Sequence, residues 1–169
     1  MEVMKAILSR RSIRKYKPDP IPDDLLRELL EAAMSAPSSD NRQPWHFVVI
    51  DDRSTLDGIT RFHPISFMLK GAPLAIAICG DLHAAKGSEV WVQDCSAATE
   101  NLLIAANACG LGAVWLGIYP TKARVCGLKG LLSLPQDIVP LALVAIGYPA
   151  EKKPRENRYN ENKVHRNTW

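Results

Sequence analysis

The chain has 169 residues, of which 47% are hydrophobic and 23% charged, with a formal net charge of +3. This mix excludes general disorder, and the length suits a single domain over residues 1–169 or one subunit of a tight dimer. The small charge gives no default reason to expect a nucleic-acid or membrane partner. There is no apolar run of membrane-spanning length and no signal-peptide core, so we expect a cytoplasmic protein.

Neither the cysteines nor the histidines form a pattern typical of metal binding. The four cysteines lie 14 to 17 residues apart without a CxxC pair, and the four histidines are equally scattered. Zinc frameworks and small disulfide-rich domains both show closer spacing. We therefore expect no metal site, and we expect each cysteine to be a small buried apolar side chain. The cysteines are Cys79, Cys95, Cys109 and Cys126.

A short basic segment near the N-terminus is the first candidate binding site. Residues 9–16 read SRRSIRKY and follow a predicted helix over residues 2–10, in which Val3, Ala6 and Ile7 should face inward. Arginine presents a planar fork of donors that suits phosphate oxygens, and a hydroxyl can share the same anion. On composition alone a solvated basic surface is the more common explanation, so the anion site depends on the rest of the chain. The candidate ligands are Arg10, Arg11, Ser12 and Arg14.

A second candidate site lies between a predicted helix and a predicted strand. Residues 22–36 begin with proline and two acids and repeat leucine and alanine every three or four residues, which predicts an amphipathic helix. Residues 37–45 are rich in proline, serine and amides and lead into the apolar strand 45–50. A simple polar turn is the alternative to a loop that binds the polar edge of a planar ligand. The candidates are Pro37, Ser38, Ser39, Asn41 and Gln43.

The middle of the chain predicts a strand and one long helix. Residues 53–62 predict a short helix and residues 63–71 an irregular connection, followed by a strand at 74–79. The helix at 89–109 is rich in small side chains, which allow another helix to approach closely. We expect this helix to cross a partner helix at a dimer interface, with a central core helix as the alternative.

The last third of the chain predicts two further strands. Gly110-Leu111-Gly112 ends the long helix in a left-handed cap, and its place at a helix end excludes a dinucleotide-binding loop. Strands are predicted at 113–119 and 141–147, with a short helical turn at 122–126 between them. The second of these strands is continuously apolar, which predicts burial on both faces.

The C-terminal segment is polar after residue 149 but closes on Val164, His165 and Trp169, which a free tail has little reason to contain. A disordered tail is the alternative. We expect residues 150–169 to form an arm that docks on a second subunit.

These segments, in this order, resemble the FMN-dependent nitroreductase family over nearly the whole chain. The motifs are individually weak, and their order makes the resemblance specific. The chain is similar to compact members, because it has no long helical insertion and its connection at 63–70 lacks the asparagine–lysine pair of larger relatives. The matching segments are RRSIR at 10–14, PSSDNRQPWHF at 37–47, GAP at 71–73, residues 110–117, and GYP at 147–149 with residues 158–169.

The resemblance implies an α+β fold, with a mostly antiparallel central sheet flanked by helices, in an intertwined homodimer with swapped C-terminal arms. Two FMN molecules would lie at the dimer interface. Arg10, Ser12 and Arg14 would hold the phosphate, the ribityl chain and the pyrimidine edge, with Arg11 in the same segment. Arg158 would join at the phosphate, with Arg155 as a helper.

The resemblance also implies contributions from the other matching segments. The loop residues Pro37, Ser38, Ser39 and Asn41 would reach the flavin of the other subunit, with Gln43 nearby. The backbone N–H groups of Leu116 and Gly117 would face flavin N5 and O4.

The implied activity is an NAD(P)H-dependent FMN oxidoreductase that transfers electrons by a ping-pong mechanism to nitroaromatic, quinone or similar small-molecule acceptors. The motifs assemble no nucleophile–base pair, metal cluster or paired carboxylates, and a flavin enzyme needs none. Arg14 would stabilise the negative charge of the reduced flavin. The alternatives are a reductive dehalogenase or flavin-consuming enzyme of the same fold, and a flavin-binding or FMN-delivery module without useful turnover. A nucleic-acid binder fits poorly, because interleaved aromatic residues are missing.

Overall fold

A four-stranded antiparallel sheet forms the centre of the computed structural model, which describes residues 2–169. The strands follow the order β1-β2-β4-β3, so β1 and β3 are the edges. All four were predicted from the sequence, although β4 begins before its predicted start. Their bounds are β1 (Trp45–Ile50), β2 (Leu74–Asp81), β3 (Gly112–Gly117) and β4 (Ile138–Gly147). This arrangement confirms the predicted α+β class with an antiparallel sheet.

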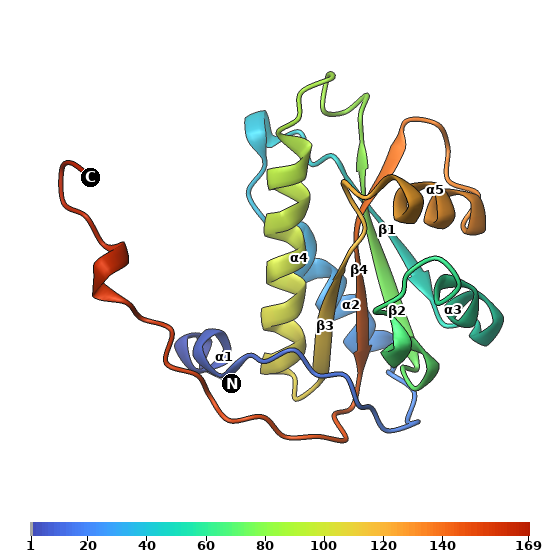
Figure 1. The fold of residues 1–169 in the computed structure, drawn as a ribbon, viewed down its shortest axis with the longest axis horizontal. Helices are drawn as coiled ribbons and strands as arrows, with labels where there is room; N and C mark the ends of the chain where they lie inside the picture. The colour runs from blue at the N-terminus through green and yellow to red at the C-terminus, as the bar shows by residue number, and fades with distance from the viewer. Residues whose placement is uncertain (1) are drawn as a thin grey trace.

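Helices cover both faces of the sheet, because the central strands are apolar on both sides. In β2, Ile76 and Ile78 pack on one face, while Ala75 and Ala77 pack on the other. Helices α2 (Asp23–Met34) and α4 (Trp91–Ala108) lie on the first face, and α3 (Arg53–Ile59) and α5 (Lys122–Leu131) on the second (Figure 1). The fold is therefore a three-layer sandwich with two apolar cores.

Helix α4 is a core helix within this chain. Cys95, Ala98 and Leu102 are fully buried against α2 and the sheet, and small side chains permit this close packing. Its outer face, with Ala97 and Glu100, is only half-buried. Within the single chain, α4 is thus the central core helix that was the alternative expectation. The predicted crossing with a helix of a partner subunit stays a prediction.

The N-terminal helix α1 (Val3–Ser9) buries less than the sequence predicts. Ala6 is buried, but Val3 and Ile7 are 69% and 42% exposed. The inward-facing prediction is wrong for these two residues, because α1 packs on the C-terminal part of α4 through the face that carries Ala6. There the Asn107 side chain donates to the Ala6 carbonyl at 2.8 Å.

Two further expectations need correction. Helix α5 extends to Leu131, beyond the predicted turn at residues 122–126. Cys79 and Cys95 are buried as predicted, and burial raises the pKa of each thiol to about 12. Cys109 and Cys126, by contrast, are exposed, since one follows the end of α4 and the other lies on the solvent side of α5.

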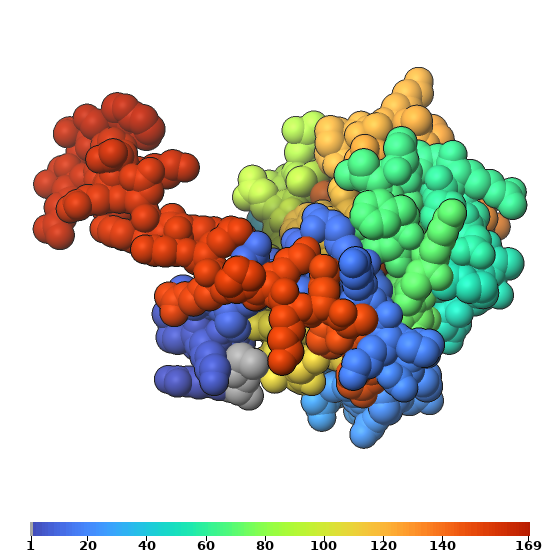
Figure 2. All heavy atoms as spheres, turned by 60° about the horizontal axis from the view of Figure 1, so that its bottom comes forward, coloured from blue at the N-terminus to red at the C-terminus, as the bar shows by residue number. Residues whose placement is uncertain are grey.

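The C-terminal segment, residues 150–169, leaves the body of the molecule as an extended arm (Figures 1 and 2). Its only helical part is the short 3-10 helix η3 (Glu161–Lys163). Tyr159 is 73% exposed and Trp169 is 99% exposed, so the arm carries aromatic side chains that this chain does not cover. Docking of the arm on a second subunit stays a prediction. Among residues 2–169, no helix is long and apolar enough to cross a membrane.

Candidate functional site

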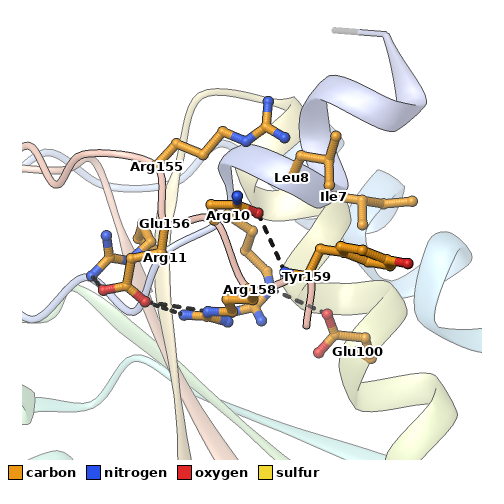
Figure 3. Close-up of a pocket in the computed structure, with 10 residues that line it drawn as sticks. Ile7, Leu8, Arg10, Arg11, Glu100, Arg155, Glu156, Arg158 and Tyr159 are labelled. Atoms are coloured by element: carbon orange, nitrogen blue, oxygen red, sulfur yellow. Dashed lines mark hydrogen bonds and ion pairs between the residues drawn. The ribbon is translucent and has the colours of Figure 1, made fainter. Parts of the chain in front are cut away.

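Four arginines from opposite ends of the sequence meet at one pocket of about 330 Å³. Arg10 and Arg11 follow the end of α1, and Arg155 and Arg158 come from the arm (Figure 3). Glu100 of α4 and Glu156 of the arm complete the charged wall. The structure thus brings together four of the residues that the sequence singled out, although they lie more than 140 positions apart.

The charges of this arginine pocket suit a doubly charged anion. Arg10 Nε donates to Glu100 Oε1 at 3.1 Å. Glu156 pairs with Arg11 Nη2 at 2.7 Å and with Arg158 Nη2 at 3.1 Å. Arg155 makes no ion pair with any described residue. The four guanidinium groups and two carboxylates therefore leave the pocket with a net charge of +2. A phosphate monoester carries about 1.5 to 2 negative charges at neutral pH, so the two charges match.

The segment after the arginines runs along the free edge of β3. The Ile13 N–H donates to the Ala113 carbonyl at 3.0 Å, and Ser12 forms a parallel bridge with the same residue. Gly112 permits this contact, because a Cβ there would lie 2.6 Å from Ile13 Cγ2. Ser12 is thereby held at the beginning of the strand, where Lys153 of the arm also donates to its carbonyl at 2.7 Å.

The other end of β3 offers a backbone N–H group. In a β-strand, the N–H and C=O groups of one residue point to one side of the strand, and those of the next residue point to the other side. The Ala113 carbonyl points to the free edge, whereas the Ile118 N–H donates to Leu141 of β4 at 3.1 Å. By this alternation the Gly117 N–H points to the free edge, and the Leu116 N–H points toward β4. Of the two donors that the resemblance implied, Gly117 therefore has the accessible one.

The free edge of β3 is long enough for an elongated ligand to lie along it. Ala113 and Gly117 are four residues apart, which is about 13 Å along a strand. A Cβ at Gly117 would meet no atom within 4 Å, so the space beside this residue is open to a flat group.

Arg14 lies outside the arginine pocket. Its backbone N–H donates to Glu151 Oε1 at 2.6 Å, and this hydrogen bond holds the pKa of Glu151 below its usual value. The Arg14 side chain is exposed, and its guanidinium group makes no ion pair with a residue in the described range 2–169. It is therefore available to a ligand.

The loop at residues 37–43 is held in an unusual backbone conformation. Asp40, Asn41 and Gln43 have φ angles of 52°, 53° and 47°, a region in which non-glycine residues are strained and which is enriched at functional sites. Gln43 N–H donates to Ser38 Oγ at 3.0 Å.

This loop does not reach the arginine pocket of its own chain. It is tied instead to the first turn of α4, where Ser39 N–H donates to Asp94 Oδ1 at 3.1 Å. The described residues that line the arginine pocket do not include Pro37, Ser38, Ser39, Asn41 or Gln43. One chain therefore does not unite the two candidate sites that the sequence predicted.

Sequence reasoning missed two residues that contact Gly117. His63 Nε2 donates to the Gly117 carbonyl at 3.1 Å, and Arg124 Nη1 donates to the same oxygen at 2.8 Å. Burial lowers the pKa of His63, which is only 1% exposed. No sequence signal identifies either residue, because His63 lies in an irregular connection and Arg124 lies in a helix. Only the fold brings these two side chains to β3.

A sequence model of the nitroreductase family matches residues 7–66 and 60–148 of this chain. The chain belongs to the nitroreductase family. This match confirms the family resemblance. Solved structures with the same fold confirm the predicted fold class.

The similar proteins support this membership over the whole length. A Methanothermobacter thermautotrophicus protein, provisionally named NADH dehydrogenase/NAD(P)H nitroreductase, is 43% identical over 100% of this chain and 88% of its own length. The structure of an FMN-dependent nitroreductase from Clostridium difficile matches with a TM-score of 0.91 and 31% identity, covering 98% of this chain and 99% of that one. A Desulfovibrio desulfuricans structure in complex with FMN matches with a TM-score of 0.86 and 32% identity, covering 100% and 98%.

Proposed function

We propose that this nitroreductase-family chain is an FMN-dependent NAD(P)H oxidoreductase that works as a homodimer. Its acceptors would be nitroaromatics, quinones or similar small molecules. The proposal is supported by the names of its relatives, which include an NAD(P)H-dependent FMN reductase from Bacillus subtilis, 29% identical over 99% of this chain and 74% of its own length. It is also supported by the FMN in the similar structure from Desulfovibrio desulfuricans.

The observation that carries the proposal is the convergence of Arg10, Arg11, Arg155 and Arg158 on one pocket next to the edge of β3. Bidentate guanidinium groups suit the phosphate of FMN, and their excess of positive charge matches its negative charge. The remaining length of the cofactor would follow the β3 edge from Ser12 toward Gly117.

The residues of the chain would bind and orient the cofactor. FMN, when bound, accepts two electrons from NAD(P)H and passes them to an acceptor. Gly117 would donate its N–H to the polar edge of the ring, and Arg14 would place a positive charge beside the pyrimidine edge. A charge pair at contact distance contributes about 1–4 kcal/mol at effective dielectric constants of 80 to 20.

The second subunit would complete the site. The loop residues Ser38, Ser39 and Asn41 do not reach the arginine pocket of their own chain, which is consistent with a role in the partner's site. Because the chain is compact and places no long insertion over this region, donor and acceptor would use the same open space in turn. This gives ping-pong kinetics.

An anaerobic titration tests the proposal. The purified protein is saturated with FMN, excess cofactor is removed, and NADH or NADPH is added under argon. We expect the flavin absorbance to bleach and to return when a quinone or nitroaromatic compound is added. Bound FMN that neither nucleotide bleaches would indicate a carrier without turnover. Bleaching that only a halogenated aromatic reverses would indicate a dehalogenase instead.

A further inference from the structure

The start of the arm runs antiparallel to the N-terminal segment at residues 10–17 (Figure 2). The two backbones pair directly at the root of the arm. The Lys17 N–H donates to the Tyr148 carbonyl at 2.8 Å, and the Ala150 N–H donates to the Lys15 carbonyl at 2.9 Å. Among residues 2–169, no further backbone hydrogen bond joins the two segments beyond Ala150. The course of the arm from there to the arginine pocket therefore depends on side chains.

Two side chains of the arm continue the register of the backbone pairs. Glu151 lies opposite Arg14 and accepts its backbone N–H at 2.6 Å. Lys153 lies opposite Ser12 and donates to its carbonyl at 2.7 Å, and its Nζ lies 3.4 Å from Oε1 of Glu151. Residues two apart in an extended chain point to the same side. Both side chains therefore reach the N-terminal segment, whereas Lys152 between them is exposed.

The next contact along the arm is made by Arg11. Its guanidinium group donates to the Pro154 carbonyl and pairs with Glu156. Arg11 lines the arginine pocket, so a bound phosphate group would compete with these two partners for it. Glu151 and Lys153 do not line that pocket, and their contacts with the N-terminal segment can persist when an anion binds.

We propose that Glu151 and Lys153 are positioning residues, which fasten the start of the arm to the N-terminal segment and thereby keep Arg155 and Arg158 at the phosphate site. The inference rests on the proposed function. Arg155 makes no ion pair with any described residue, and Arg158 pairs with Glu156 of the same arm, so neither arginine fastens the arm to the body. An arm that is free in the apoprotein would have to be ordered when the cofactor binds, and this ordering costs affinity.

The first test needs no cofactor. Amide hydrogen exchange is measured by NMR in the apoprotein, where the Arg14 N–H reports on the fastening and the Lys17 N–H reports on the root of the arm. We expect Lys153→Met to speed exchange of the Arg14 N–H by about fivefold or more, because the arm and its Glu151 acceptor open more often. The Lys17 N–H should stay within about twofold of its wild-type rate. Lys153→Arg keeps a charged donor and should resemble the wild type.

The second test is FMN affinity, measured by fluorescence titration. Lys153→Met should weaken binding by about fivefold to tenfold, because the arm is no longer ordered in advance, and Lys153→Arg should recover most of the affinity. Lys152→Met is the matched control, since it removes the same charge one residue away from a side chain that forms no hydrogen bond or ion pair within residues 2–169. It should change the affinity by less than about twofold.

A double-mutant cycle tests whether Lys153 acts through the arginines of the arm. In a chain that already carries Arg155→Ala and Arg158→Ala, Lys153→Met should weaken FMN binding by less than about twofold, because the groups that it positions are absent.

Three results would overturn the proposal: an unchanged exchange rate of the Arg14 N–H in Lys153→Met, equal losses of affinity in Lys152→Met and Lys153→Met, or the same loss from Lys153→Met with and without the two arginines. A wild-type protein that takes up no FMN would instead refute the proposed function, and the exchange rates of the apoprotein would still report on the fastening of the arm.

Discussion

Glu156 lies between Arg11 and Arg158 and pairs with both, so a bound phosphate group would compete with its carboxylate for these two arginines. It is half exposed, at 51% for its side chain. An exposed ion pair contributes only about 0.2–1 kcal/mol, so the carboxylate is a weak competitor for the guanidinium groups. Glu100 has the same relation to Arg10. Sequence reasoning found the arginines but missed both carboxylates, because each pairing depends on the fold.

Substitution Glu156→Gln removes this competitor while keeping the size of the side chain. We expect it to tighten FMN binding by about twofold to fivefold, measured by fluorescence titration, since repulsion of the phosphate is removed. Glu161→Gln in the same arm is the control and should have no effect. Weaker binding in Glu156→Gln would show that the carboxylate orders the arginines instead.

Arg14 is expected to act on the redox equilibrium. Arg14→Ala should weaken FMN binding and lower the two-electron midpoint potential by roughly 20 mV or more, because about 1 kcal/mol of charge stabilisation is lost from the reduced state. Lys15→Ala, which removes the neighbouring exposed cation, is the control. If both quantities stay at wild-type values in Arg14→Ala, the role assigned to Arg14 is wrong.

The protonation of Asp52, at the start of α3, should make the stability of the folded protein depend on pH. Its carboxylate accepts from Ser54 Oγ, Thr55 Oγ1 and Thr55 N–H, and these hydrogen bonds lower its pKa from 3.8 to about 2. A lowered pKa stabilises the folded state at pH above 3.8, and this contribution is lost as pH falls toward 2. In urea unfolding at decreasing pH, Asp52→Asn should therefore lose less stability over this interval than wild type. Parallel curves would contradict this assignment.

At the scale of elements, hydrophobic patterning predicted the strands and α2, since continuous or periodic apolar runs leave few other arrangements. The end of α5 was missed, because Gly127 and Gly130 resemble helix breakers in the sequence. The structure explains one of them by packing: a Cβ at Gly127 would lie 2.5 Å from Cγ of Phe62. Side-chain packing between distant residues, not helix termination, requires this glycine.

The two glycines of α5 give a matched pair of substitutions. Gly127→Ala should lower the free energy of unfolding by about 1–3 kcal/mol, because the methyl group meets the Phe62 ring. Gly130→Ala should raise it by about 0.4–1 kcal/mol, because that position is exposed and a Cβ there meets no atom within 4 Å. Chemical denaturation measures both. Equal effects of the two substitutions would contradict the packing role of Gly127.

At the scale of the whole molecule, the basic segment and the arm were predicted to act together, and they line one pocket in this chain. The loop at residues 37–43 lies apart from that pocket, so the proposed flavin site needs the loop of a second subunit. The exposed aromatic residues of the arm, Tyr159 and Trp169, point to the same requirement. Patterning in a single sequence does not specify contacts between subunits, and for this reason only the family resemblance suggested the shared site.

The most direct measurement is sedimentation velocity of the FMN-saturated protein, followed at a protein wavelength and at a flavin wavelength. If two subunits build the flavin site, we expect one species with twice the 18.7 kDa mass of the chain, carrying one FMN per chain. A monomer that retains FMN, or a dimer that sediments without it, would contradict a flavin site built by two subunits.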